Sequence, residues 1–268
     1  MGPGQRDRRP HENSGVRAQR SGTLGDGRLI VQARRNVPLL SQLPQFDPRR
    51  VPVVAEDGSL PPIAREQLTP AALRQRFRAP PSWQPEVRRE QSFSDRAPAP
   101  AAVLVPLVER LGGLSVLLTE RTANLSTHSG QIAFPGGKVD AQDAGAVDAA
   151  LRETEEEVDL KRDFVEVIGQ LPAYVTGSQF IVTPVVALVR EGFLLHPNPH
   201  EVAHAFEVPL DFLMDPAHHR RHRFEWEGSV REWYSMPYVE PARPAAVEHF
   251  IWGATAGMLR NLYRFLAA

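Results

Sequence analysis

The stretch that decides the fold is "FPGGKVDAQDAGAVDAALRETEEEVDL", residues 134–160. After two adjacent glycines, apolar residues recur at helical spacing, which predicts a helix over about 144–158. On that helix Glu153, Glu156 and Glu157 lie at i, i+3 and i+4, so their carboxylates project from one face. Like charges so placed repel one another, which raises the question of what positive charge the face accommodates.

A divalent cation is one answer, because Mg²⁺ takes oxygen ligands and is often shared with substrate phosphates. Arg152 lies one turn before Glu156 and could fix its side chain. Gly136 and Gly137 let the backbone approach a ligand closely. A solvated acidic face is the alternative, because most charge runs are of that kind. The double glycine next to the acidic helix favours the metal site.

Segments outside this stretch predict strands at 101–110 and 114–121, joined by a turn at Gly112-Gly113. Further strands are expected within 164–171, 179–189 and 205–213, the last turning into a helix. Residues 229–239 and the start of 248–266 predict a strand pair, and the remainder of 248–266 predicts a C-terminal amphipathic helix. Strands that flank a helix and end with a closing helix indicate an α/β (α+β) sandwich.

Three regions are expected along the chain. Residues 1–35 are rich in arginine and lack periodic apolar residues, which predicts a disordered tail; a basic nucleic-acid arm, a transit peptide and a start codon assigned too early are the alternatives. Residues 36–97 predict a proline-rich arm with one short helix, capped by Thr69, and with Trp83 as an anchor. Residues 98–268 form the main domain.

Composition excludes several classes of site and partner. The net charge of -1 gives no overall argument for nucleic acid, and no apolar run approaches the roughly 18 residues of a membrane span. The chain has no cysteine, which excludes disulfides, thiolate metal sites and thiol nucleophiles. We therefore expect a cytoplasmic protein without a membrane partner.

Residues 136–160 resemble the Nudix box, the signature of hydrolases that cleave a diphosphate linked to another moiety. The box has Gly, five residues, Glu, seven residues, Arg-Glu, an apolar residue, any residue, Glu-Glu, any residue and Gly. Here Asp143 stands at the first Glu, one extra residue precedes Arg152, Thr154 fills the apolar position, and Asp159 replaces the closing Gly. The resemblance implies a Nudix α-β-α sandwich with a mixed β-sheet.

The segment upstream resembles the coenzyme A pyrophosphatase branch of this superfamily. Its pattern is Leu-Leu-Thr-x-Arg, then Gly, then Phe-Pro-Gly-Gly, and the matching residues are Leu117, Leu118, Thr119, Arg121, Gly130, Phe134, Pro135, Gly136 and Gly137. The resemblance extends over roughly residues 98–260. It implies hydrolysis of coenzyme A or acyl-CoA to 3′,5′-ADP and (acyl-)4′-phosphopantetheine.

The resemblance also implies roles for individual residues. Glu153, Glu156 and Glu157, with the Gly136 carbonyl, would bind Mg²⁺ or Mn²⁺, and Glu153 would orient or deprotonate the attacking water, supported by Arg152. Glu201, before the strand at 205–213, is a candidate for an additional catalytic acid. The candidate substrate contacts are Arg121, Gly130, Phe134, Gly136, Gly137 and Lys138.

Other assignments stay open. Arg121 could instead make a surface salt bridge, and His128 could bind phosphate or only backbone. Phe180 and Trp252 are expected in the core and not beneath an adenine ring. The substrate could be ADP-ribose, NADH or another dinucleotide, and the chain could be a Nudix-derived binding module without catalysis. A homodimer could form through residues 36–97 or the C-terminal helix.

Overall fold

The computed structural model describes residues 46–268 except 93, 95, 123–129, 227 and 241–246. The Arg-rich segment expected at 1–35 lies outside the described residues. The α-helices in the described part are α1 (Pro70–Arg78), α2 (Ala146–Val158), α3 (Leu210–Leu213) and α4 (Gly253–Ala267). The short 3-10 helices are η2 (Pro48–Arg50), η3 (Arg65–Leu68), η4 (Arg162–Phe164) and η5 (Pro216–His218).

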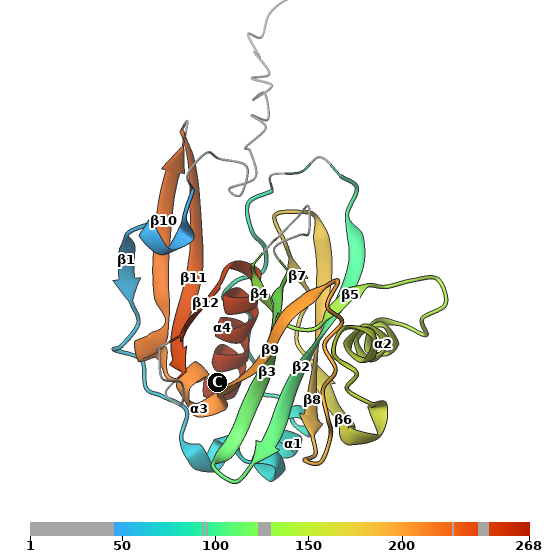
Figure 1. The fold of residues 1–268 in the computed structure, drawn as a ribbon. Coiled ribbons are helices and arrows are strands. Elements are labelled where there is room, and N and C mark those ends of the chain that lie inside the picture. Colours follow the sequence, from blue (N-terminus) through green and yellow to red (C-terminus); the bar gives the residue numbers. More distant parts are fainter. Residues whose placement is uncertain (1–45, 93, 95, 123–129, 227, 241–246) are drawn as a thin grey trace, which may run out of the picture. The chain divides into compact units, whose positions relative to one another are not determined.

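The strands form two sheets (Figure 1). The larger sheet contains β2 (Ala99–Arg110), β3 (Gly113–Arg121), β4 (Ile132–Ala133), β5 (Gly136–Lys138), β6 (Val165–Gln170), β7 (Tyr174–Val175), β8 (Phe180–Val189) and β9 (Val202–Pro209). The smaller sheet contains β1 (Val53–Glu56), β10 (Arg220–Trp226), β11 (Ser229–Glu240) and β12 (Val247–Trp252).

The larger sheet is mixed and is built around β2. This strand pairs in parallel with β8 from Ala99↔Phe180 to Val108↔Val189, while its last residues pair antiparallel with β3. Beside the first residues of β2, the short strand β5 takes the place of β3. β9 pairs with the other edge of β3. The end of β3 and the whole of β5 therefore lie near the acidic helix α2.

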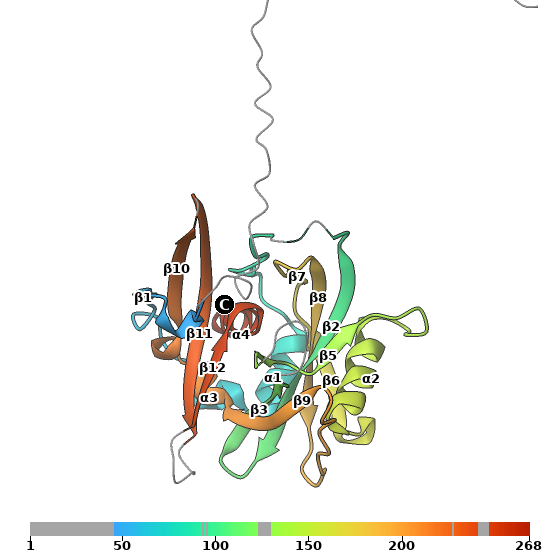
Figure 2. The same cartoon turned by 45° about the horizontal axis from the view of Figure 1, so that its top comes forward.

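Helices cover both faces of this sheet, as Figure 2 shows. α2 packs on one face, where its buried Ala149, Ala150 and Val158 join strand residues such as Leu104 and Leu117. α4 packs on the other face together with α1, which contributes the fully buried Leu73. Successive side chains of a strand point to opposite faces of the sheet, so the strands contribute to both of the two separate cores. This arrangement confirms the predicted α-β-α sandwich with a mixed sheet.

The smaller sheet forms a further layer that the sequence did not predict as a sheet. Its four strands are antiparallel in the order β1-β10-β11-β12, and Tyr234, Met236 and Ile251 pack into the same core as α4. The pair β11–β12 was expected from the sequence. β10 was missed because its sequence, RRHRFEW, is charged at most of its exposed positions and has few apolar residues.

The arm between residues 46 and 92 packs on the main core. Thr69 caps α1 by accepting the Ala72 N–H at 3.3 Å, and Pro70 occupies the first helical position, as predicted. The ring of Trp83 lies 5.2 Å from that of Phe265 on α4, which confirms its anchoring contact. The division of the chain at residues 97 and 98 stays a prediction. Within the described residues, no helix combines the length and apolar character that a membrane crossing requires.

Candidate active site

Two carboxylates of α2 are turned toward the sheet. Thr154 and Val158 are buried beneath the helix, so Glu157, which lies between them on the same face, is carried inward and is only 3% exposed. Glu153 lies one turn earlier, and its side chain is 19% exposed. The amphipathic pattern of the helix thus places two acids at the edge of its buried face.

The double glycine lies directly opposite these acids. Gly136 and Gly137 are the first two residues of the strand β5. The Gly136 N–H donates a 3.2 Å hydrogen bond to Glu157 Oε2. A Cβ on Gly136 would lie 2.6 Å from the Cα of Val103 on the neighbouring strand. β5 can run between β2 and α2 because glycine at these two positions has no Cβ to clash with either element.

The electrostatics of this pair are unfavourable for two negative charges. Burial raises the pKa of Glu157 to about 7, with further contributions from Glu201 and Glu153, against the opposing effects of the Gly136 N–H and Arg121. Burial also raises the pKa of Glu153, with contributions from Glu156 and Glu201, although Arg152 acts in the opposite direction. The two carboxylates and Glu201 therefore influence one another, and added positive charge between them would favour their ionised forms.

Arg152 is held on the outer side of the helix by several oxygens. Asp143 accepts hydrogen bonds from its Nε at 2.8 Å and from its Nη2 at 2.9 Å, and the carbonyl of Lys138 accepts another at 3.3 Å. The Asp143 side chain is 2% exposed, and Arg152 lowers its pKa to about 2. The same guanidinium contacts Glu153 at 3.0 Å and Glu156 at 3.2 Å. Arg152 thus ties the loop before α2 to the acidic face.

The expected contact between Arg152 and Glu156 is present, and it holds Glu156 at the exposed side of the helix, apart from the buried Glu157. The Glu156 side chain is 61% exposed, whereas Glu157 is buried. The same nitrogen of Arg152, Nη1, contacts both Glu153 and Glu156, so the guanidinium links these two carboxylates at the outer edge of the helix. Glu201 acts on the charge of both Glu153 and Glu157, whereas Glu156 acts on Glu153 and is not among the charges that act on Glu157.

The strand end opposite α2 supplies one cation and one further acid. Arg121 ends β3, and its Nη1 lies 3.8 Å from Glu157 Oε1. The Gly130 N–H donates to the Arg121 carbonyl at 3.1 Å, and Gly130 has a φ of +67°. The carbonyl of Glu201 accepts the Thr122 N–H at 3.0 Å, which holds Glu201 beside the end of β3.

The motif that precedes Arg121 is mostly structural. Leu117 and Leu118 are fully buried on opposite faces of the sheet, and the buried Thr119 donates to the Ala133 carbonyl at 3.3 Å. Phe134 is only 3% exposed and belongs to the core on the α4 side. Its side chain therefore does not line the site, contrary to the expectation of a substrate contact. The motif aligns β3, β4 and β5 and leaves Arg121 facing the acids.

The remaining predicted residues are more scattered. Lys138 is exposed at the end of β5, and His128 lies outside the described residues. Phe180 packs against the core, with the Arg96 guanidinium 5.4 Å from its ring centroid. Trp252 lies 5.8 Å from Trp233 in an aromatic cluster of the smaller sheet. Neither aromatic ring lines the carboxylate site.

The oxygen donors at this site are of the chemical type that binds divalent cations, although they are not already arranged as a metal centre. Among the residues that the structure describes, no three acidic or histidine side chains come close enough to hold a metal ion without rearrangement. Glu153 and Glu157 are oxygen donors of the type that Mg²⁺ and Mn²⁺ accept, and burial, followed by neighbouring carboxylates, raises the pKa of both. A cation would supply the charge that this pair lacks.

The role of Asp143 was the main feature that sequence reasoning left undecided. The sequence does suggest an ion pair here, because Asp143 is an acid in the loop that leads to Arg152 on the helix. Its partner could not be assigned from spacing alone, since Asp140 and Asp148 lie in the same segment. In the structure Asp140 approaches Arg152 only to 3.7 Å, and Asp148 pairs instead with Arg162 at 2.6 Å.

Comparisons with known proteins indicate the family of the chain. A family model described as the NUDIX domain matches residues 98–242. The protein named "Uncharacterized Nudix hydrolase NudL" from Citrobacter koseri is 43% identical over 164 residues, which are 60% of this chain and 80% of that protein. The protein of the same name from Escherichia coli K12 is 40% identical over 179 residues, 66% of this chain and 86% of that protein. Among solved structures, RenU, a Nudix hydrolase from M. smegmatis, is 28% identical and covers 43% of this chain and 73% of its own, with a TM-score of 0.38.

Proposed function

Because the chain belongs to the Nudix family, we propose that it is a divalent-metal-dependent hydrolase that splits the diphosphate of coenzyme A or acyl-CoA. The products would be 3′,5′-ADP and 4′-phosphopantetheine or its acyl derivative. The observation that carries the proposal is the pair Glu153 and Glu157, held against the glycine strand β5 with raised pKa values.

Glu153 and Glu157 would bind Mg²⁺ or Mn²⁺, with Glu156 and the Gly136 carbonyl as further candidate ligands. The metal would polarise a phosphoryl oxygen and lower the pKa of a bound water. Glu153, half-enclosed and in contact with Arg152, is the candidate to orient or deprotonate the attacking water. Glu201 is the second candidate for this role, because its charge already acts on both acids.

Cations at the rim would hold the substrate. Arg121 lies 3.8 Å from Glu157, so a phosphate bound beside the metal would be within reach of its guanidinium. Lys138 is exposed at the end of β5, and its carbonyl accepts a hydrogen bond from Arg152. Asp143 acts through Arg152 and is a positioning residue. A hydrolysis of this kind requires no covalent intermediate, which is consistent with a chain that has no cysteine.

The choice of coenzyme A as the substrate is the most specific part of the proposal, and it rests on the resemblance of residues 117–137 to the coenzyme A pyrophosphatase branch. The test is turnover of a panel containing coenzyme A, acetyl-CoA, ADP-ribose and NADH, each with Mg²⁺ or Mn²⁺, with products identified by mass. Preferred release of 3′,5′-ADP from the CoA species is the expected result. Preference for ADP-ribose or NADH would contradict coenzyme A as the substrate but would support the hydrolase activity. No product from any member of the panel would favour a binding module without catalysis.

We expect a cytoplasmic protein that acts on a small molecule, and no nucleic-acid partner. RNA binding that weakens with salt and is lost when residues 1–35 are deleted would contradict the second expectation.

A further inference from the structure

The hairpin that joins β2 to β3 carries an apolar side chain that its turn does not require. Leu111 and Gly112 are the two central residues of this turn, and Gly113 has a φ of +119°. Neither central residue has a positive φ, so the first of them could be any common polar turn residue. Leu111 is nevertheless fully exposed at the tip. An apolar side chain without a local structural role is a candidate for a contact with another molecule.

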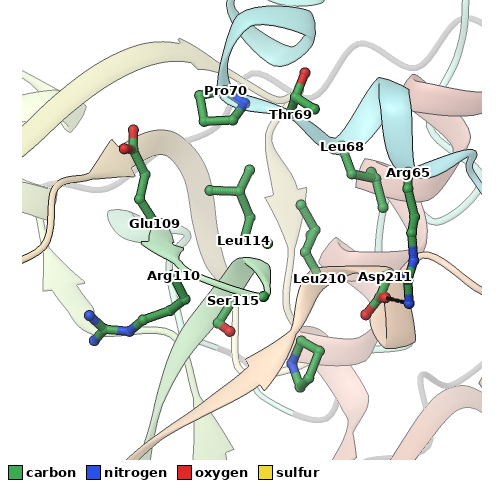
Figure 3. A pocket seen from close by; sticks show the side chains of 13 residues that line it. Arg65, Leu68, Thr69, Pro70, Glu109, Arg110, Leu114, Ser115, Leu210 and Asp211 are labelled. Carbon is green, nitrogen blue, oxygen red and sulfur yellow. Dashed lines mark hydrogen bonds and ion pairs between the residues drawn. The ribbon is translucent and has the colours of Figure 1, made fainter.

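The groove drawn in Figure 3 is lined in part by this hairpin. Its volume is about 340 Å³, and Gly112 and Gly113 form part of its lining. The apolar part of the lining comes from three elements: η3 with the start of α1, the beginning of β3, and the beginning of α3, through the residues Leu68, Pro70, Leu114 and Leu210. The apolar tip and an apolar groove are therefore neighbours on one face of the molecule.

This groove is distinct from the carboxylate site. β3 runs from Gly113, at the groove, to Arg121, at the carboxylates. Eight residue steps at about 3.3 Å each separate the two ends by roughly 26 Å. Contacts at the groove can thus be altered without touching the proposed catalytic residues.

We propose that this face is a self-association surface, in which Leu111 of each copy enters the groove of a second copy. A two-fold symmetric contact requires that a projecting group and its recess lie on the same surface patch, which is the case here. The rim charges also allow it. Glu109 and Arg110 lie on the hairpin wall, and Arg65 and Asp211 lie on the opposite wall, where they pair at 2.9 Å. Arg110 also pairs with Glu207 within the same copy, so both arginines at the rim are already neutralised and present little net charge to a second copy.

A second exposed leucine follows a phenylalanine that contacts the hairpin. Leu194 is 76% exposed, and the ring of its neighbour Phe193 lies 5.3 Å from the guanidinium carbon of Arg110 at the hairpin. The contact is nevertheless small compared with the surfaces of permanent dimers. It therefore predicts a concentration-dependent dimer and not a permanent one.

The first test is sedimentation velocity on the full chain at concentrations up to about 200 µM, a range that detects a micromolar dissociation constant. Leu111→Asp should raise the dimer dissociation constant at least about tenfold, because a charged side chain cannot enter the apolar groove. Val54→Asp is the matched control, since Val54 is 51% exposed but lies on β1 in the other sheet. Turnover at low protein concentration should be the same in both variants. A chain that stays monomeric over the whole range, or equal effects of the two variants, would overturn the proposal.

A second test asks where the tip lies. Because the native chain has no cysteine, the double variant Leu111→Cys with Pro70→Cys introduces the only two thiols. Mild oxidation should give a disulfide-linked dimer, confirmed by peptide mass as a link between positions 111 and 70 of different copies. A dimer linked only through 111–111 would show tip-to-tip contact and would contradict occupation of the groove.

Discussion

Gly137 leaves free the space that the carboxylate of Glu153 occupies. A Cβ at Gly137 would lie 2.5 Å from Glu153 Oε2 and 2.7 Å from Oε1, which is closer than non-bonded atoms can approach. The glycine that precedes the loop and the acid that follows it, sixteen residues later in the chain, are therefore in direct contact across β5 and α2. The spacing between the double glycine and the acidic helix reflects this contact.

Gly137→Ala should displace Glu153 and lower turnover by about a hundredfold, because a shift of about 1 Å at a reacting group can have that effect. The backbone itself should tolerate alanine, since Gly137 does not have a positive φ. Gly112→Ala is the matched control, because a Cβ there meets nothing within 4 Å. Steady-state kinetics on coenzyme A, with circular dichroism to verify folding, measures the effect. Equal activity of the two variants would contradict the proposed position of Glu153.

Asp143→Asn should lower turnover or metal affinity by about ten- to a hundredfold, because a neutral amide cannot hold the Arg152 guanidinium as the carboxylate does. Asp140→Asn, whose carboxylate is 52% exposed and 3.7 Å from Arg152, should change little. The metal concentration at half-maximal rate, compared between the two variants, is the measurement. A larger effect of Asp140→Asn would show that Asp143 is not the residue that positions Arg152.

Acid should destabilise the protein partly through Glu86. Burial alone would raise the pKa of Glu86, but hydrogen bonds from Arg260, Tyr234 and Arg264 outweigh it and lower the pKa to about 2, from 4.5. The folded state therefore keeps this group ionised where the unfolded chain binds a proton. Its contribution, about 3 kcal/mol, is fully present above pH 4.5 and is lost as the pH falls toward 2.

Denaturant unfolding between pH 2 and 7 tests this account of Glu86. Glu86→Gln should lower the free energy of unfolding at pH 7 and flatten its pH dependence below pH 4.5. Glu66→Gln, an exposed acid in η3, controls for the loss of one negative charge. The same pH dependence in the native chain and Glu86→Gln would assign the acid sensitivity to other groups.

Asp159 ends α2 in the left-handed conformation, with φ 61° and ψ 25°. Its carboxylate pairs with Lys161 at 2.6 Å and with His196 at 3.0 Å. Asp159→Gly and Asp159→Ala both remove these pairs, and only glycine adopts the conformation without strain. Asp159→Gly should therefore be more stable than Asp159→Ala by about 1 kcal/mol. Thermal unfolding of the two variants measures the difference, and equal stability would mean that the helix end relaxes.

The sequence predicted those parts of the fold in which periodicity and packing agree. α2 was expected over 144–158 and is found at Ala146–Val158, and the long strands β2, β3 and β8 lie where apolar residues cluster. β5 was not predicted, because two glycines indicate a bend when only local preference is considered. The constraint that makes them a strand comes from Val103 and Glu153, which are distant in sequence.

The candidate site was predictable in composition but not in arrangement. Helical spacing brought Glu153, Glu156 and Glu157 to one side of α2, but it could not indicate that burial separates Glu157 from the exposed Glu156. The positions of Arg121 and Glu201 depend on the pairing of β3 with β9, which is a tertiary contact. Local pattern therefore identified the chemical groups, and the sheet determines which of them meet.

The measurement that tests the central claim most directly compares Glu157→Gln with the native chain in Mg²⁺-dependent hydrolysis of coenzyme A. Glutamine keeps an acceptor for the Gly136 N–H and removes a buried charge, so stability without metal should be equal or higher. Turnover should fall at least about a hundredfold, because a lost metal ligand forfeits several kcal/mol of charge stabilisation. Added Mn²⁺ should raise the unfolding temperature of the native chain but not that of the variant. Glu155→Gln, outside the proposed site, should behave like the native chain. Native-like turnover and native-like stabilisation by Mn²⁺ in Glu157→Gln would contradict the account.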